Sequence, residues 1–292
     1  AHKLGLPESI PLPGSLEAVE LPDRPLQDYG IALNISAETL RNHLVSLQQA
    51  LTGQHLSFEW AAQSDSQEYS FQSVLSPMTD DKGRMTGVVG VTRDISEMKR
   101  LENTLRQRVS DLNALNEVSR AFLSQLEAQA IMQESCRLLV KLFDVEAAWV
   151  GYFNEEDMTV LPTAADGIEL ARLPLLTTQN KTASVQHPAL VALRDKAPVV
   201  IGQDTPGVSA IWDTLAPIER AFNELLALPV STDGSRAALV IFSRQKNSFL
   251  PGAIQLFQAF SNLMTIALSN AELFNQVRTD QARLQLLSHR LV

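Results

Sequence analysis

The sequence predicts an α+β protein in which two blocks of helices and antiparallel strands are joined by one long helix. Three observations support this fold class. Short segments of alternating apolar and polar residues, separated by turn residues, indicate strands in both blocks. Apolar residues repeated every three or four positions indicate helices. A seven-residue spacing of apolar residues over positions 94–122 indicates the joining helix.

The composition is that of an ordinary globular protein. The 292 residues suffice for about two domains, with 45% apolar residues, 20% charged residues and a net charge of −9. The negative charge argues against a nucleic-acid surface or a polybasic membrane patch. There is no visible secretory signal, no apolar run near the ~20 residues that cross a bilayer, and one cysteine, which fits a reducing compartment. We therefore expect a cytoplasmic region without membrane contact.

The first block opens with a proline-rich stretch, residues 1–36, in which only short helical turns are expected. Leucines three and four positions apart predict a helix over residues 37–51 that stops at Gly53. Three alternating segments with short turns between them predict an antiparallel meander. The predicted strands are residues 56–60, 69–75 and 85–92.

The joining helix is expected to start at Asp94, whose side chain can cap the first turn while Glu97 reaches back to its amide. The seven-residue spacing of apolar residues along this helix favours burial of a narrow seam against a partner helix. The alternative is an amphipathic helix lying on its own domain. Arg108 is the polar interruption of the seam. The two seven-residue series are Met98, Leu105 and Leu112, and Leu101, Arg108, Leu115 and Phe122.

The second block alternates helices and strands along residues 131–275. A turn at Asp233-Gly234 joins its last two strands, and Pro251 starts a long helix with apolar residues at helical spacing. Predicted helices are residues 131–143 and 188–194, and predicted strands are residues 147–153, 158–161, 198–201, 225–230 and 237–243. Seven-residue spacing returns at the end of the chain, in Val277, Leu284 and Leu291 and in Leu273, Asp280 and Leu287.

The first block resembles the C-terminal half of a PAS sensor domain. The most specific part is Gly-Val-Val-Gly-Val-Thr-Arg-Asp-Ile-Ser at residues 87–96, which is similar to the family's junction between its last strand and the outgoing signalling helix. A strand that ends in Ser76-Pro77 and an Asp-Lys-Gly turn precede it. The first two strands of the family are not evident, so residues 1–97 are interpreted as a partial PAS-like domain, followed by a signalling helix at residues 98–122.

The second block resembles a GAF domain, over residues 112–275. The resemblance rests on the order and spacing of several short pieces. They are Leu115-Asn-Glu-Val-Ser119, Ala-Trp-Val-Gly-Tyr at 148–152, Leu-Ala-Leu-Pro-Val at 226–230 and Ala-Leu-Ser-Asn-Ala-Glu-Leu-Phe at 267–274. Both families are single antiparallel sheets flanked by helices, which agrees with the α+β class.

Residues 276–292 are interpreted as the start of a helix that leads to an absent output domain. The stretch from Leu284 to Val292 is similar to the one before the phosphoacceptor helix of a large subfamily of bacterial sensor histidine kinases. In that family the phosphorylated histidine would lie beyond Val292, so His289 is expected to be an exposed helix residue. The first residue is Ala rather than Met, and we expect a piece of a longer protein.

No catalytic motif is found in this chain. It contains no phosphate-binding Gly-x-x-x-x-Gly-Lys, no dinucleotide fingerprint and no nucleophile elbow, and its histidines and single cysteine give no metal-binding spacing. His43 falls where some PAS domains hold a haem ligand, but it lies at the edge of a leucine stripe, so a surface histidine is expected. His187 is expected to start the helix at Pro188, with a ligand role no more favoured than for its neighbours.

The resemblance to GAF domains raises the question of a ligand. Cys136 lies on the apolar face of a predicted helix and is expected to be a buried thiol, whereas bilin-binding relatives use a loop cysteine. The cysteine of flavin-photoadduct PAS domains is also missing. The stretch Asn180-Lys-Thr-Ala-Ser is only a fragment of the cyclic-nucleotide motif. An apolar pocket could form around Trp149, Phe153 and Trp212, although large aromatics are more often core. The cofactor is unknown, and a covalently bound one is not expected.

The resemblances together imply the sensory region of a bacterial two-component sensor histidine kinase. Its paired helices would form a homodimer, and a signal would change their packing. The parent enzyme would transfer phosphate from ATP to its own histidine and then to a response regulator. PAS and GAF domains also precede diguanylate cyclases, phosphodiesterases and transcription regulators, and a stand-alone dimerisation scaffold is a third interpretation.

Overall fold

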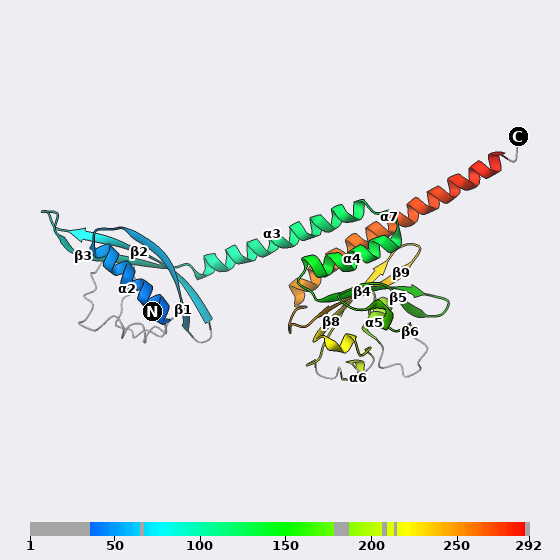
Figure 1. The fold of residues 1–292 in the computed structure, drawn as a ribbon, viewed down its shortest axis with the longest axis horizontal. Helices are drawn as coiled ribbons and strands as arrows, with labels where there is room; N and C mark the ends of the chain where they lie inside the picture. Colours follow the sequence, from blue (N-terminus) through cyan, green and yellow to red (C-terminus); the bar gives the residue numbers. More distant parts are fainter. Residues whose placement is uncertain (1–35, 65–66, 178–186, 206–208, 213–214, 290–292) are drawn as a thin grey trace. The chain divides into compact units, whose positions relative to one another are not determined.

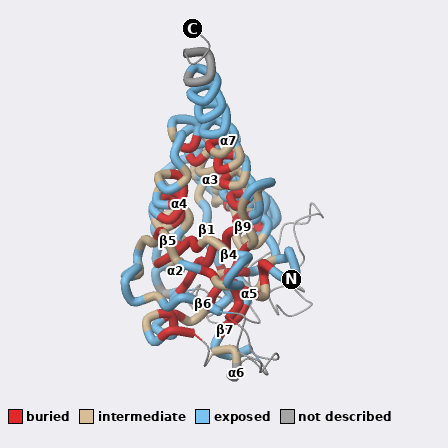
Figure 2. Tube along the Cα trace, turned by 90° about the vertical axis from the view of Figure 1, so that its right-hand side faces the viewer, coloured by how far each residue is buried: buried red, intermediate tan, exposed pale blue. Residues whose placement is uncertain are grey.

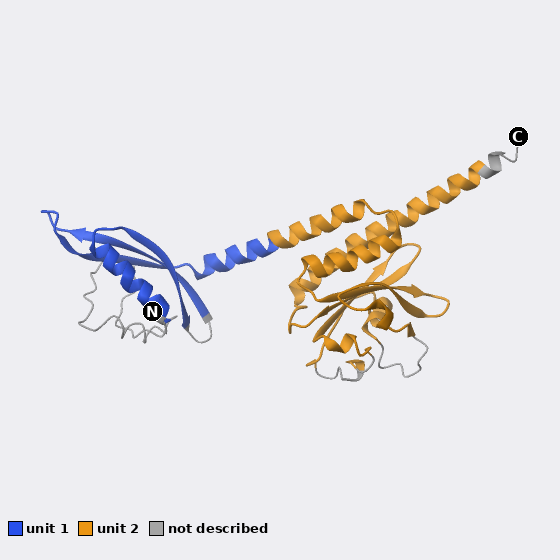
Figure 3. Ribbon diagram, in the orientation of Figure 1, with its two compact units in different colours: residues 1–108 blue, residues 109–292 orange. Residues whose placement is uncertain are grey.

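The computed structural model divides into two compact units, residues 1–108 and residues 109–292 (Figure 3). The boundary between them lies inside the helix that joins the two blocks. The residues that the structure describes are 36–64, 67–177, 187–205, 209–212 and 215–289 (Figure 1).

The first unit contains a three-stranded antiparallel sheet in the order β1-β2-β3, as the predicted meander requires. Helix α2, Ala37–Leu51, has the predicted bounds, and the Ser36 side chain caps it by accepting a hydrogen bond from the amide of Thr39 at 3.1 Å. The helix ends before Gly53, which has a left-handed φ of +96°. The strands are β1, Leu56–Ser64, β2, Gln67–Thr79, and β3, Met85–Asp94.

Helix α3, Ser96–Leu123, begins one residue later than a cap at Asp94 would place it. The carbonyl of Ile95 accepts the first helical hydrogen bond, and the predicted cap residue Asp94 accepts instead from the amide of Ser96 at 2.9 Å. The Ser96 hydroxyl in turn accepts a hydrogen bond from the amide of Ser70 in β2, also at 2.9 Å. The start of α3 is therefore fixed to the sheet of its own unit.

The second unit contains a six-stranded antiparallel sheet in the order β6-β5-β4-β9-β8-β7. Its strands are β4, Ala147–Asn154, β5, Thr159–Asp166, β6, Leu176–Thr177, β7, Val199–Gly202, β8, Glu224–Ser231, and β9, Arg236–Ser243. Its helices are α4, Ala128–Leu142, η2, Leu170–Arg172, α5, Pro188–Asp195, α6, Ser209–Trp212, η3, Glu219–Ala221, and α7, Pro251–His289.

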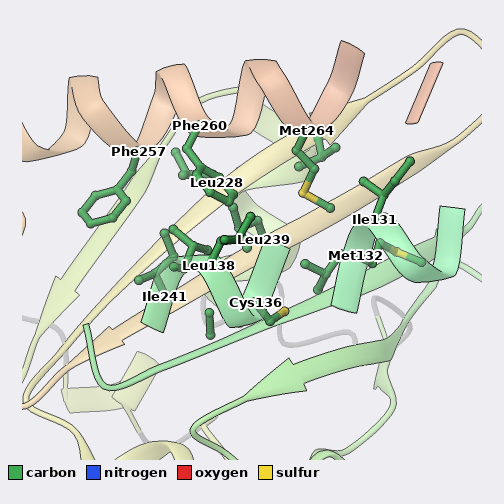
Figure 4. Close-up of a cluster of buried hydrophobic side chains, with 14 of the residues drawn as sticks. Ile131, Met132, Cys136, Leu138, Leu228, Leu239, Ile241, Phe257, Phe260 and Met264 are labelled. Atoms are coloured by element: carbon green, nitrogen blue, oxygen red, sulfur yellow. The ribbon is translucent and has the colours of Figure 1, made fainter. Parts of the chain in front are cut away.

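Helices cover both faces of the six-stranded sheet (Figure 1). One face packs against α4, α7 and the end of α3, where Phe122 meets Phe260 edge to face at 6.0 Å between ring centroids. Figure 4 shows Leu228 and Leu239 of the sheet between the side chains of α4 and α7. Burying each such large apolar side chain contributes about 1.5–3 kcal/mol. The other face packs against α5 and the segments around α6 and η3.

Gly167 follows β5 at a position that only glycine fits. Its φ is +69°, and a Cβ atom there would lie 2.0 Å from the carbonyl oxygen of Glu146. This close approach allows the chain to leave β5 beside the start of β4.

Candidate functional site

Trp149, His187 and Glu219 form a buried polar group on the face of the six-stranded sheet that α5 covers, called here the Glu219 cluster. Trp149 lies in the middle of β4, His187 is the residue before α5, and Glu219 opens η3. All three are at most 4% exposed. A carboxylate buried to this degree requires hydrogen-bond donors, because burial otherwise destabilises its charge.

Three donors reach the Glu219 carboxylate. The indole Nε1 of Trp149 donates to Oε1 at 3.0 Å, and the amide of Ala216 donates to Oε2 at 2.8 Å. His187 Nε2 lies 3.3 Å from Oε1 and 3.4 Å from Oε2. The carboxylate therefore links β4, the start of α5 and the segment before η3 through one side chain.

The hydrogen bonds assign the tautomer of His187. Its Nδ1 accepts from the amide of Ala189 at 3.1 Å and caps α5, so the proton of the neutral ring lies on Nε2 and points to Glu219. Burial acts to raise the pKa of Glu219, but the bonds from His187, Ala216 and Trp149 outweigh it and hold the pKa below its ordinary value. Glu219 is therefore a carboxylate at neutral pH.

This cluster is suited to holding three segments in place. It combines one carboxylate with one imidazole, and both are shielded from solvent. Within the described part of the chain, no group of three or more histidine, cysteine, aspartate or glutamate side chains is arranged to hold a metal ion. The α5 face consequently has a fixed polar centre inside an apolar core.

The three aromatic residues of the predicted apolar pocket do gather on this face. Trp149 is buried in the core, and Phe153 and Trp212 pack against the same core while partly buried. Arg236 lies over the Phe153 ring at 4.5 Å and pairs with Glu155 at 2.8 Å. The aromatic side chains therefore contribute to packing on the α5 face.

A polar cleft of about 350 Å³ lies at one end of β7 and β8. Its charged groups are already paired: Lys246 Nζ lies 2.5 Å from Asp204, and Glu224 accepts the amides of Asn247 and Ser248 at 2.6 and 2.8 Å. The cleft is open and adjoins the chain after β7. Its lining residues are Gly202, Gln203, Asp204, Thr205, Asn223, Glu224, Lys246 and Asn247.

The remaining sequence candidates lie apart from the Glu219 cluster. Cys136 is fully buried between α4 and the sheet, as expected (Figure 4). The expectation of a surface position for His43 is wrong: its ring is half-buried, with its edge against Phe58 and Trp60 at 5.0 and 4.9 Å. It donates through Nδ1 to the carbonyl of Thr39, so packing explains its place in α2.

The fragment Asn180-Lys-Thr-Ala-Ser lies outside the described residues. His289 is the last residue of α7. Sequence reasoning missed Glu219, the residue on which the cluster depends. It lies in a segment without periodicity, and no local signal identifies it. None of the described helices is long and apolar enough to span a membrane.

Comparison with known proteins gives one family match. The model of the GAF domain family matches residues 125–269. No curated protein matches the chain. Similar solved structures include the GAF domain of an Acinetobacter phosphoenolpyruvate-protein phosphotransferase, with 14% identity, TM-score 0.45, and 55% of this chain and 93% of that chain covered. Another is the free methionine-R-sulfoxide reductase of Neisseria meningitidis, with 10% identity, TM-score 0.47, and 56% and 90% covered.

Proposed function

Because residues 125–269 form a GAF domain, we propose that this chain is the sensory and signal-relay region of a bacterial signalling protein. A small molecule binds the GAF domain and changes the packing of the helices that enter and leave it. Two copies of the chain pair through these helices. The relay is a two-state element, and the ligand biases it to the extent that it binds one state better.

The observation that carries this proposal is the exposure of apolar side chains on the helices at both ends of the GAF domain. Leu105 and Leu112 of α3 are 64% and 66% exposed, and Val277 and Leu284 of α7 are 54% and 66% exposed. Figure 2 draws the later part of α7 as exposed. Apolar side chains at regular helical spacing are typical of a surface that another helix covers.

The first unit is proposed to be a partial PAS-like domain over residues 1–97, with a signalling helix over residues 98–122. Helix α2 packed on the antiparallel meander supports this interpretation. The hydrogen bond between Ser70 and Ser96 supports it further, since it joins the sheet to the first turn of α3. A change in this sheet would therefore reach the helix directly.

The output is proposed to be a histidine kinase in the cytoplasm, with residues 276–292 leading to a part beyond Val292. That part would phosphorylate its own histidine and pass the phosphate to a response regulator. The GAF-like region is proposed to extend over residues 112–275, because Val118 and Phe122 of α3 and Ala271 of α7 belong to its core. The α5 face and the cleft beside β7 are the proposed ligand surfaces.

Sedimentation of the whole chain over micromolar concentrations tests the pairing of helices. We expect a dimer for the unaltered protein and a monomer for Leu105→Glu, because the new charge would have to enter an apolar seam. Asn103→Glu is the matched control: it adds the same charge to the opposite side of α3, where Asn103 is exposed, and should remain dimeric. A monomeric unaltered protein would contradict the proposal.

Ligand binding requires a separate test. Thermal unfolding in the presence of a panel of small metabolites should show a rise in Tm for a ligand of the folded GAF domain. The same ligand should change the sedimentation or hydrogen exchange of α7. A ligand that raises Tm without affecting either helix would contradict the relay while leaving the binding intact.

A further inference from the structure

The register of the six-stranded sheet places one cation at the end of an apolar row on the α5 face. Residues that lie directly opposite each other on antiparallel strands share a face of the sheet. The row crosses β9, β4, β5 and β6, and it consists of Arg236, Phe153, Val160 and Leu176. Val160 and Leu176 are buried in the core of this face, and Phe153 packs against the same core. Arg236 is therefore a charged neighbour of the proposed ligand surface.

The guanidinium of Arg236 has only part of its hydrogen bonds. Its central carbon lies 4.5 Å from the centroid of the Phe153 ring, and its Nη2 lies 2.8 Å from Glu155 Oε1. Its Nε is buried and is the one buried side-chain nitrogen or oxygen of the described residues that has no hydrogen-bond partner. An unpaired buried donor is destabilising, so an acceptor that reaches Nε is favoured. The side chain is 33% exposed, which leaves it accessible from solvent.

Glu155 shows which chemistry this guanidinium accepts. Nε and Nη2 lie on the same edge of the group, and together they form the pair of donors that two oxygens of a carboxylate or phosphate bind. Glu155 occupies Nη2 with one oxygen and leaves Nε unpaired. Its carboxylate comes from the turn between β4 and β5 and is 73% exposed. Because an exposed ion pair contributes little to stability, a better-placed oxyanion can displace it.

We propose that Arg236 binds the anionic group of a small organic ligand on the α5 face, and that Glu155 occupies this position in the absence of the ligand. This inference rests on the proposed function, since it names the ligand class for one of the two proposed ligand surfaces. A carboxylate or phosphate of the ligand accepts from Nε and Nη2, and its apolar body contacts Phe153. Ser231 lies directly opposite Arg236 on β8 and is exposed, so its hydroxyl provides a further donor beside the guanidinium.

The charge of Arg236 selects against the other ligand classes. A cationic group would be repelled by the guanidinium. A neutral acceptor could bond to Nε, but it would have to replace the charged carboxylate of Glu155 at Nη2. Hydrogen bonds to charged groups are stronger than those between neutral groups, so this exchange is unfavourable. An anion alone gains Nε without losing the charged partner of Nη2.

Titration calorimetry of the whole chain with matched probes tests the ligand class. The probes are benzoate and phenyl phosphate, which distinguish a carboxylate from a phosphate, and benzamide is the neutral control with nearly the shape of benzoate. We expect at least one anion to bind, at least about tenfold more tightly than benzamide, because only the anion pairs with the charge of Arg236. Equal binding of benzamide and the anions would overturn the proposal.

Two substitutions then separate the roles of Arg236 and Glu155. Arg236→Gln should weaken binding of the anion at least about tenfold, whereas Glu155→Gln should strengthen it by up to about fivefold, because it removes the competing carboxylate. Arg137→Gln is the matched control: it removes an exposed, ion-paired arginine from α4 on the opposite face of the sheet, and it should leave binding unchanged. Thermal unfolding checks that each variant is folded.

The outcomes distinguish this inference from the proposed function on which it rests. Unchanged binding in Arg236→Gln, or unchanged or weaker binding in Glu155→Gln, would overturn the inference. If neither anion binds while an uncharged metabolite raises the Tm, the anionic class is overturned and the proposed sensory function stands. If neither the probes nor any metabolite of the panel binds, both are overturned.

Discussion

Trp149 Nε1 donates a hydrogen bond to Glu219 Oε1 across 3.0 Å, although the two residues are 70 positions apart in the chain. The bond joins the centre of β4 to η3, and His187 joins the start of α5 to the same carboxylate. One buried side chain thus determines where three segments of the α5 face lie. If this face binds a ligand, its shape depends on Glu219.

Removing the Glu219 carboxylate should destabilise the second unit strongly. Glu219→Ala leaves three buried donors without a partner, and each unsatisfied donor costs about 1–3 kcal/mol. We expect a loss of at least about 3 kcal/mol in the free energy of unfolding, measured by urea denaturation. Glu155→Ala is the control, because its ion pair with Arg236 is exposed on the glutamate side and should contribute about 0–1 kcal/mol. Equal losses in both variants would contradict the structural role of Glu219.

The pH dependence of stability should reveal the charge of Glu219. Its pKa is lower in the folded protein than the ordinary value of 4.5, so its charged form stabilises the fold above that pH. This contribution is lost as the pH falls from 4.5 through the folded pKa. In urea denaturation, the free energy of unfolding should fall less on acidification for Glu219→Gln, which has no charge to titrate, than for the unaltered protein. If the free energy of unfolding depended on pH in the same way in both proteins, the assignment of a lowered pKa to Glu219 would be contradicted.

The elements of this fold could be predicted because their signals are local. Leucines spaced by three and four gave the bounds of α2, and alternation gave β1 to β3 and most strands of the second unit. Within the described part of the second unit, four elements were missed because they are too short to show a period. They are η2, Leu170–Arg172, β6, Leu176–Thr177, α6, Ser209–Trp212, and η3, Glu219–Ala221.

The polar cluster could be predicted only in part. Pro188 indicated that His187 starts a helix, and the side chain of His187 does cap it. Its partner Glu219 lies 32 residues later, and this distance is set by the packing of α5 and η3 on one sheet rather than by any local pattern. His43 was misplaced for a similar reason, since the rings of Phe58 and Trp60 extend the buried face of α2 beyond the leucines.

The thiol of Cys136 should be unreactive in the folded protein. Burial raises the pKa of this thiol well above its ordinary range, so almost no thiolate is present at mildly alkaline pH. A thiol reagent such as iodoacetamide should modify the protein only after denaturation, when mass spectrometry should show one added group. Asn103→Cys provides the control, because Asn103 is exposed on the side of α3 opposite Leu105 and its thiol should react in the folded state. Rapid modification of the unaltered folded protein would show that the α4 core opens.

Glu272 of α7 should couple the β8–β9 turn to the helix that leaves the GAF domain. Its Oε1 accepts hydrogen bonds from Thr232 at 2.9 Å and from Ser235 at 2.5 Å, next to Ala271, which belongs to the core. Bonds to a charged group contribute about 1.5–3 kcal/mol each. We expect Glu272→Ala to speed hydrogen exchange at the Ser235 amide and in the adjoining turn of α7.

Gln276→Ala is the matched control for this coupling, because Gln276 is exposed one turn further along α7. It should leave exchange in the β8–β9 turn unchanged. A double-mutant cycle between Glu272→Ala and Ser235→Ala should give a coupling energy of about 0.5–3 kcal/mol, because the two side chains share one hydrogen bond. Additive effects, or turn exchange that is unaffected by Glu272→Ala, would mean that α7 and the hairpin move independently.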